Sequence, residues 1–416
     1  MRGVTFDPRI LFVDQTGKLG GAELCLADLV VHLRERCTVL LFESGPFQEL
    51  LEQNKVATVC LAGASRPKVT KEAKLSAYFL ALPAFVSLLF SVGRLARGFD
   101  VLYANTAKAL VATAVVGLVL RKAFLFHLHD IIDSEHFSRL NRWLLVAAAN
   151  RASGIVANSE ATAEAYRKAG GRNRNLVVVP NGFEVERFSA EEESVSREIR
   201  AAIGCKGKPL VGVFGRITAW KGQKVLIEAL SNLPDVTAVI VGEALFTEED
   251  QQYKQELTVL ADHLGVADRV HFTGFQRDVL PFLKAVDLVV HCSTSPEPFG
   301  RVIVEALLAG KPVIATRHGA PAEIIEDGVT GVLVSPGDPV LLAEAIERLL
   351  ADRRWAEKLA RAGRDSAGKR FSLDRVLAKW TEFINRTVQG LVEPEPQASD
   401  PTRKRAKGRE VRLTGT

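Results

Sequence analysis

One stretch of this 416-residue chain decides its fold: Glu297-Pro298-Phe299-Gly300-Arg301-Val302-Ile303-Val304-Glu305. The apolar run 287–291 before it predicts a buried parallel strand. The pattern over 302–308 predicts a helix that ends near Gly310 and Pro312. Strand, turn and helix in this order form the unit of open α/β sheets, which bind ligands at the carboxyl ends of their strands.

Two carboxylates, Glu297 and Glu305, flank the start of this predicted helix. A helix N-terminus offers unpaired N–H groups to an anion. Two negative charges would repel a phosphate there, whereas carboxylate oxygens accept hydrogen bonds from hydroxyl groups. The pattern therefore favours a sugar-like polyol as the ligand of this turn.

Short β-branched runs alternate with helical segments along the rest of the chain. The predicted strands cover residues 10–14, 37–42, 56–61, 100–104, 123–128, 153–157, 176–179, 210–214, 236–241, 269–273, 286–291, 312–316 and 331–334. This alternation predicts parallel sheets in two Rossmann-like α/β domains. We place them at 1–188 and 189–371, divided at a polar segment without predicted strands. A last helix is predicted over 372–390, followed by a disordered tail, 391–416.

Composition sets broader bounds. Hydrophobic residues make up 47% of the chain, enough for each domain to have its own core. Five cysteines without CxxC spacing predict reduced, buried thiols rather than disulfides or a zinc site. No signal peptide precedes the first predicted strand, so a cytoplasmic location is expected.

Charge is spread unevenly along the chain. Residues 1–190 carry 23 Lys/Arg against 17 Asp/Glu, a net charge of +6, whereas residues 191–390 carry 25 against 28, a net charge of −3. A basic first half favours an anionic acceptor or a membrane surface. Nucleic acid is not expected as a partner, because basic residues are not clustered with interleaved aromatic residues outside the short tail.

A second turn carries two cations. Gly215 and Arg216 follow the predicted strand 210–214, and Lys221 and Gly222 open the next helix. The helix dipole and both cations can act together on a diphosphate. No GxGxxG follows a predicted strand and no GxxxxGK[ST] occurs, which argues against a nicotinamide-binding unit and a P-loop.

The first domain adds two features at strand ends. Gly20 and Gly21 precede Glu23 between the first strand and its helix, where glycines let the backbone approach a ligand closely. His127 and His129 end the strand 123–128 and project to the same side. A metal pair is conceivable, but the sequence suggests no third ligand. The other histidines show no comparable support; they are His32, His136, His263, His271, His291 and His318.

Together these motifs resemble those of the retaining glycosyltransferases of family 4, which have the GT-B fold of two Rossmann-like domains facing across a cleft, closed by a C-terminal helix. The resemblance implies that Arg216 and Lys221 neutralise the departing diphosphate. It also implies that Glu297 holds the transferred sugar and that Glu305 holds the ribose of the nucleotide. His129 is expected to hydrogen-bond the donor sugar.

Further donor contacts are implied at Gly21, Gly215, Phe275, Phe299 and Gly300. In this family the base and phosphates are contacted largely by the backbone of such loops. The resemblance implies no metal and no cofactor other than the nucleotide-sugar co-substrate.

The sequence thus predicts a retaining, metal-independent glycosyltransferase (hexosyltransferase class) that moves a sugar from a nucleotide-sugar to a glycan or lipid-linked acceptor in cell-envelope or polysaccharide biosynthesis. Uridine and guanosine donors stay open, as do glucose, mannose and N-acetylglucosamine. Two alternatives share the fold: a nucleotide-sugar 2-epimerase-type isomerase and a non-catalytic sugar-binding protein. The joint presence of two cations and two glutamates at the predicted site argues against the non-catalytic protein.

An uncharged run, 75–93, stands apart from these motifs. Its length approaches that of a transmembrane helix, but Pro83 interrupts it and a predicted strand follows at once. Basic residues flank the run on both sides: Lys68, Lys71, Lys74, Arg94 and Arg97. Two interpretations remain, a buried helix of the first domain and a peripheral docking site on the anionic inner face of a membrane.

Overall fold

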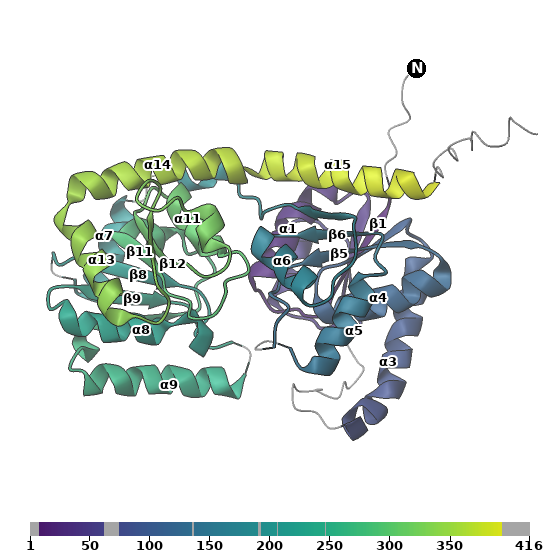
Figure 1. Cartoon of the computed structure of the whole chain (residues 1–416), viewed down its shortest axis with the longest axis horizontal. Helices are drawn as coiled ribbons and strands as arrows, with labels where there is room; N and C mark the ends of the chain where they lie inside the picture. Colours follow the sequence, from purple (N-terminus) through teal and green to yellow (C-terminus); the bar gives the residue numbers. More distant parts are fainter. Residues whose placement is uncertain are drawn as a thin grey trace, which may run out of the picture.

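The computed structural model describes residues 8–61, 75–134, 137–189, 193–205, 207–245 and 247–392. Two α/β domains lie side by side, and two long helices, α14 (Arg353–Phe371) and α15 (Leu373–Val392), run along both of them (Figure 1). The tail from residue 393 lies outside the described residues, and so do Lys68, Lys71 and Lys74.

The first domain is built on a parallel sheet of seven strands. In spatial order these are β3 (Thr58–Cys60), β2 (Cys37–Leu41), β1 (Ile10–Asp14), β4 (Val101–Ala104), β5 (Ala123–Leu128), β6 (Gly154–Ala157) and β7 (Leu176–Val178). The inner strands β1 and β4 are buried along their whole length because helices cover both faces of the sheet.

Each face of this sheet has its own hydrophobic core. Helices α1 (Gly21–Val30) and α2 (Pro46–Gln53) cover one face, and α15 joins them there. The helices on the other face are α3 (Leu75–Ala96), α4 (Ala107–Leu120), α5 (Arg139–Ala149) and α6 (Glu160–Lys168). This division follows from right-handed crossovers that leave β1 and β4 in opposite directions.

The second domain repeats this plan with six parallel strands. Their spatial order is β10 (Val270–Gly274), β9 (Thr237–Val241), β8 (Leu210–Phe214), β11 (Leu288–His291), β12 (Val313–Thr316) and β13 (Val332–Val334). Its helices before α14 are α7 (Glu193–Ile203), α8 (Gln223–Ala229), α9 (Glu248–His263), α10 (Leu280–Ala285), α11 (Arg301–Leu308), α12 (Pro321–Ile324) and α13 (Pro339–Ala351).

The chain crosses between the domains at two places that lie against each other. Phe183 donates its backbone N–H to the carbonyl of Phe371, and Leu373 donates back to the carbonyl of Phe183. Beyond this crossing, α15 packs on the first domain, where the buried Trp380 indole donates to the Tyr103 hydroxyl at 2.9 Å. The last helix therefore completes the core of the domain that begins the chain.

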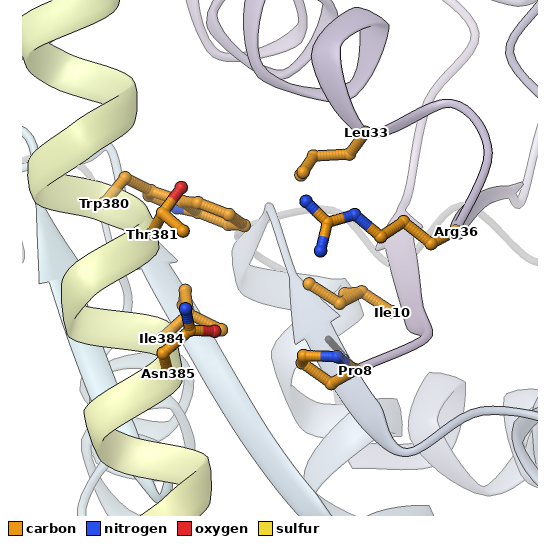
Figure 2. A pocket seen from close by; sticks show the side chains of 8 residues that line it. All are labelled: Pro8, Ile10, Leu33, Arg36, Trp380, Thr381, Ile384 and Asn385. Atoms are coloured by element: carbon orange, nitrogen blue, oxygen red, sulfur yellow. The ribbon is translucent and has the colours of Figure 1, made fainter. Parts of the chain in front are cut away.

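A small pocket follows the seam between α15 and the first domain (Figure 2). Trp380 and Ile384 line it from the helix, and Ile10 and Arg36 line it from the sheet side. Ile10 begins β1 and Arg36 directly precedes β2. The pocket therefore opens at the amino ends of the strands, opposite to the edge where such sheets bind ligands.

The predicted α/β architecture of two parallel sheets is confirmed. Each of the predicted strand ranges overlaps an observed strand, and the predicted helix over 302–308 begins one residue earlier, at Arg301. The uncharged run forms α3, which continues through Pro83. No helix among the described residues is long and apolar enough to cross a membrane.

Candidate functional site

The loops after β8 and β11 come together because these strands are neighbours in the second sheet. Gly222 has a φ of +69°, and a Cβ there would lie 2.0 Å from the carbonyl oxygen of Cys292. Thr294 donates its backbone N–H to the Trp220 carbonyl at 2.8 Å. Glycine at 222 is therefore required for the short helix η3 (Ala219–Lys221) to press against the end of β11.

The close packing of these two loops brings the Lys221 side chain into contact with the Glu297 carboxylate. The Lys221 ammonium donates to Glu297 Oε2 at 2.6 Å, and both side chains are largely buried. His291 Nε2 and Ser293 Oγ reach the same oxygen at 2.9 and 3.0 Å. Burial opposes ionisation of the carboxyl, but the Lys221 charge and the His291 hydrogen bond outweigh it and hold the pKa of Glu297 well below its usual range.

The backbone around Glu297 is fixed from the opposite side. Glu297 donates its N–H to the carbonyl of His318, and Ala320 donates to the carbonyl of Glu297. Gly319 lies between them with a φ of +85°, and a Cβ there would meet the Glu297 carbonyl oxygen at 2.4 Å. The carboxylate is thus held by both its side-chain partners and a closely packed backbone.

The next two residues that we predicted to bind the donor surround the start of α11. Gly300 is the N-cap of α11 and has a φ of +88°, a left-handed conformation that glycine adopts without strain. The Phe299 side chain is buried against Phe371, with ring centroids 5.9 Å apart. Phe299 therefore anchors the loop through its ring, which leaves only its backbone as a ligand group.

Arg216 and Phe275 follow two other strands of the same sheet, β8 next to β11 and β10 at the edge of the sheet. Arg216 directly follows Gly215 after β8, and its guanidinium lies 6.0 Å from the Trp220 ring centroid. Gly215 itself has a φ of +128° and lies against Gly242. A Cβ at position 242 would lie 1.9 Å from the carbonyl oxygen of Gly215. Phe275 follows β10 and is half exposed.

The first domain contributes a chain of buried polar groups at the ends of β1, β4 and β5. Asn105 donates its side-chain amide to Asp14 Oδ2 at 2.6 Å, and its amide oxygen lies 2.9 Å from His129 Nε2. His129 therefore carries its proton on Nε2. Burial, together with the nearby charge of Arg301, lowers the pKa of His129 to about 3, so the ring is neutral at pH 7.

The buried Glu23 side chain lies within reach of the Asp14 charge and has an unusual protonation state. Burial and the negative charge of Asp14 raise its pKa to about 8, and burial raises the pKa of Asp14 to about 6. The charge of Arg216 in the second domain opposes this rise in the pKa of Glu23. At neutral pH Glu23 is therefore mainly protonated and can donate a hydrogen bond.

The His127 ring packs against the His129 ring, and Cys25 adds a third potential metal ligand to the two histidines. Donor atoms of Cys25, His127 and His129 fall within 4.8 Å of one another. The two imidazoles, however, are 3.9 Å apart at 30° between planes. Ring-nitrogen lone pairs lie in the ring planes, so nearly stacked rings do not point at a common ion. The arrangement fits packed aromatic core better than a metal centre.

Arg301 connects the site to the first domain. Its guanidinium pairs with Asp28 of α1 at 3.1 Å and approaches Glu305 of its own helix at 3.6 Å. It also lies next to Gly21, where a Cβ would be 3.7 Å from Arg301 Cδ. Burial raises the pKa of Glu305, and Arg301 opposes that rise.

Two further contacts bring the domains together. Ser159 donates its hydroxyl to the Pro298 carbonyl at 2.6 Å. The Glu323 carboxylate accepts the backbone N–H groups of Glu160 and Ala161 at 2.9 and 2.7 Å. It therefore occupies the N-terminus of α6, where a negative charge is favoured.

The structure thus brings Lys221 into direct contact with Glu297. Arg301 lies next to Gly21, and its charge acts on His129. Sequence reasoning gave no role to His291, Ser293, Asn105 or Arg301. The sequence offered no support for a role of His291. The structure corrects this interpretation, because His291 hydrogen-bonds Glu297. Its position as the last residue of a strand, six residues before the acid, was the available signal.

Comparison with known proteins identifies the family. The protein-family model described as glycosyl transferases group 1 matches residues 195–366. The family model of glycosyltransferase family 4 matches residues 19–187. A GDP-mannose-dependent phosphatidylinositol monomannoside mannosyltransferase of Mycolicibacterium smegmatis is 31% identical over 276 residues, which cover 62% of this chain and 69% of that protein. The chain belongs to the family 4 glycosyltransferases.

One solved structure resembles this chain over most of its length. The crystal structure of Anabaena Alr3699/HepE in complex with UDP-glucose has a TM-score of 0.83 and 39% sequence identity, and the match covers 91% of this chain and 100% of HepE. The lipopolysaccharide core biosynthesis glycosyltransferase LpsE of Rhizobium meliloti is 38% identical over 176 residues. That match covers 42% of this chain and about half of LpsE, 49%. These matches confirm the predicted GT-B fold.

We predict that stability falls as pH rises because of Glu23. In the unfolded chain this carboxyl ionises near its ordinary pKa of 4.5, whereas in the fold it keeps its proton up to about 8. The folded state binds the extra proton between these values, so stability decreases with rising pH by at most about 1.4 kcal/mol per pH unit for one group. Glu23→Gln mimics the protonated form and should flatten this slope.

Denaturant unfolding of both proteins between pH 5 and pH 8, the window bounded by this shift, is the measurement. Asp14 adds a smaller fall of the same sign that ends near its pKa of about 6 and persists in the variant. Glu43→Gln, a change on the exposed surface, serves as the matched control. An unchanged slope in Glu23→Gln would show that Glu23 ionises normally in the fold.

Proposed function

We propose that this protein is a retaining glycosyltransferase that transfers a sugar from a nucleotide-sugar to a glycan or lipid-linked acceptor in cell-envelope or polysaccharide biosynthesis. The main observation behind this proposal is the hydrogen bond of 2.6 Å from Lys221 Nζ to Glu297 Oε2, where the loops after β8 and β11 meet. It puts a cation for a diphosphate and a carboxylate for sugar hydroxyls in one place. Membership of family 4 supports the same conclusion.

The donor that we favour is a uridine diphosphate sugar. HepE, matched over its full length, has been crystallised with UDP-glucose and with UDP and glucose. The mycobacterial relative is named for GDP-mannose but matches a smaller share of this chain. We propose that Glu305 holds the ribose hydroxyls and that the loop containing Phe275 contacts the base.

The reaction that we propose breaks the bond between the anomeric carbon and the diphosphate oxygen. The acceptor hydroxyl attacks the same face of the sugar, and its proton passes to the departing diphosphate. Arg216 and Lys221 stabilise the negative charge that develops on the leaving group, so no metal is required in this scheme. Protonated Glu23 can donate a hydrogen bond to a sugar or acceptor oxygen, and Nδ1 of neutral His129 can accept one from a hydroxyl group, so neither residue adds charge.

Glu297 is well suited to orient the sugar. Its Oε2 accepts from Lys221, His291 and Ser293, which fixes the carboxylate plane before substrate arrives. No hydrogen bond among the described residues reaches Oε1. We propose that this second oxygen accepts hydroxyl groups of the transferred sugar. A positioned carboxylate loses less freedom on binding than a mobile one.

The experiment that tests this function starts with thermal shifts for UDP, GDP and ADP sugars. The stabilising donor, radiolabelled in its sugar, is then incubated with the protein and a membrane extract, with and without EDTA. We expect label in a glycan or lipid fraction, unaffected by EDTA. Conversion of the free nucleotide-sugar into its 2-epimer would support the isomerase instead, and binding without either reaction would support a sugar-binding protein.

Removing either cation should slow transfer. Arg216→Ala and Lys221→Ala should each lose about 2–4 kcal/mol of transition-state stabilisation, because each removes a charge that faces the leaving group. The measurement is kcat/KM for the donor, together with thermal stability. Lys224→Ala, which breaks only a surface pair with Glu228, is the matched control. Near-normal turnover in either variant would remove that residue from the site.

The two glutamates should separate in their effects. Glu305→Gln should weaken binding of the bare nucleoside diphosphate and of the full donor alike, because the ribose is common to both. Glu297→Gln should leave nucleoside diphosphate affinity unchanged and lower turnover. Calorimetric titration and steady-state kinetics measure these quantities, with the surface change Glu357→Gln as control. Equal loss of nucleotide affinity in both variants would contradict the assigned roles.

A further inference from the structure

Three helices of the first domain present large apolar side chains to solvent. Phe90 on α3, Val119 on α4 and Trp143 on α5 have 74%, 75% and 65% of their surface exposed. Monomeric proteins rarely expose contiguous apolar patches of this kind, and such patches mark interaction sites. Other exposed members of the same helices are Leu82, Val86, Val115, Leu118 and Leu140. We call this set the apolar face.

The three helices that present the apolar face are neighbours. On α3, Leu82, Val86 and Phe90 are four residues apart, a spacing that aligns them along one side of a helix. α4 packs against α3 on one flank and against α5 on the other. All three helices lie on the same side of the first sheet (Figure 1).

The charges on the three helices of the apolar face all have the same sign. Helices α3, α4 and α5 contain Arg94, Lys108, Arg139 and Arg142 and no Asp or Glu. Arg94 follows Phe90 by one helical turn, and Arg139 precedes Trp143 by one turn, so these cations border the exposed apolar side chains. Only an anionic partner with an apolar interior complements this combination.

We propose that the apolar face docks this protein on a membrane that contains anionic lipids. Phe90, Val119 and Trp143 enter the interfacial region, and the bordering arginines contact the headgroups. Tryptophan suits such a position because its ring has an apolar body and a polar N–H. The docking brings the first domain, the acceptor side of the proposed enzyme, to a surface that contains lipid-linked glycans, but it does not depend on catalysis.

Two other occupants fit less well. A second copy of the chain, related by a two-fold axis, would set cations against cations with no acidic residue on these helices to pair with them. The segment 62–74 of the same chain has four basic residues against one acidic residue and few apolar ones. It therefore matches neither the charge nor the apolar character of the face.

Co-sedimentation of the full chain with vesicles tests the proposal. The vesicles contain either equal parts of phosphatidylcholine and phosphatidylglycerol or phosphatidylcholine alone, each at low and high salt. We expect binding to the anionic vesicles only, and weaker binding at high salt. One variant replaces apolar side chains: Phe90→Ser, Val119→Ser and Trp143→Ser. A second replaces cations: Arg94→Gln, Arg97→Gln, Arg139→Gln and Arg142→Gln.

Each cation contributes about five-fold to binding an anionic surface, so the second variant should lose binding by two orders of magnitude or more. The apolar variant should also fail to sediment, while circular dichroism stays unchanged because these side chains lie outside the core. Matched controls, Val259→Ser with Val340→Ser and Arg354→Gln, alter exposed residues of the second domain and should bind normally.

Wild-type protein that stays in the supernatant with anionic vesicles at low salt would overturn the proposal. So would a wild-type dimer in analytical ultracentrifugation that the apolar variant converts to a monomer, because the face would then bind a second copy. Loss of vesicle binding together with normal sugar transfer to a soluble acceptor supports docking and leaves the proposed function intact. The two proposals can therefore fail separately.

Discussion

The contact between Lys221 and Glu297 constrains the rest of the second domain. The two residues are 76 positions apart in the sequence and lie in loops after adjacent strands of one sheet. A largely buried carboxylate is unfavourable unless a cation and hydrogen-bond donors compensate for the lost water, and breaking such a pair costs much more than the pair contributes to stability. Both loops must therefore approach closely, which requires glycine at 222 and 319, where any Cβ would overlap the neighbouring backbone.

Both domains use the same topological device. In the first sheet the crossovers leave β1 and β4 in opposite directions, and in the second sheet they leave β8 and β11 in opposite directions. Open sheets form a crevice at such points, at the carboxyl ends of the strands. Asp14 and Asn105 occupy the first crevice, and Lys221 and Glu297 occupy the second. The two halves of the candidate site therefore lie at the same topological position in their respective sheets.

Contacts between the domains then join these halves. Arg301 binds Asp28, and Glu323 caps the N-terminus of α6 with a charge-assisted pair of hydrogen bonds. The polar surroundings explain why buried groups near the cleft have such different proton affinities. Glu297 has a cation in contact and ionises readily, whereas Glu23 is buried, has a carboxyl neighbour and keeps its proton. The pKa values of these two side chains therefore depend on burial and on their partners, since the isolated side chains are alike.

The sequence by itself determined the strands, the two parallel sheets and the turns with Lys221 and Glu297, because these depend on local apolar periodicity and on short motifs with fixed spacing. It did not reveal that His291 and Ser293 hold Glu297, that Asn105 fixes the tautomer of His129, or that Arg301 reaches Asp28. Nor did it reveal that Leu82, Val86 and Phe90 of the run 75–93 are exposed. These points follow from the tertiary fold alone, because each depends on which distant segment packs against the residue, and no local pattern encodes that neighbour.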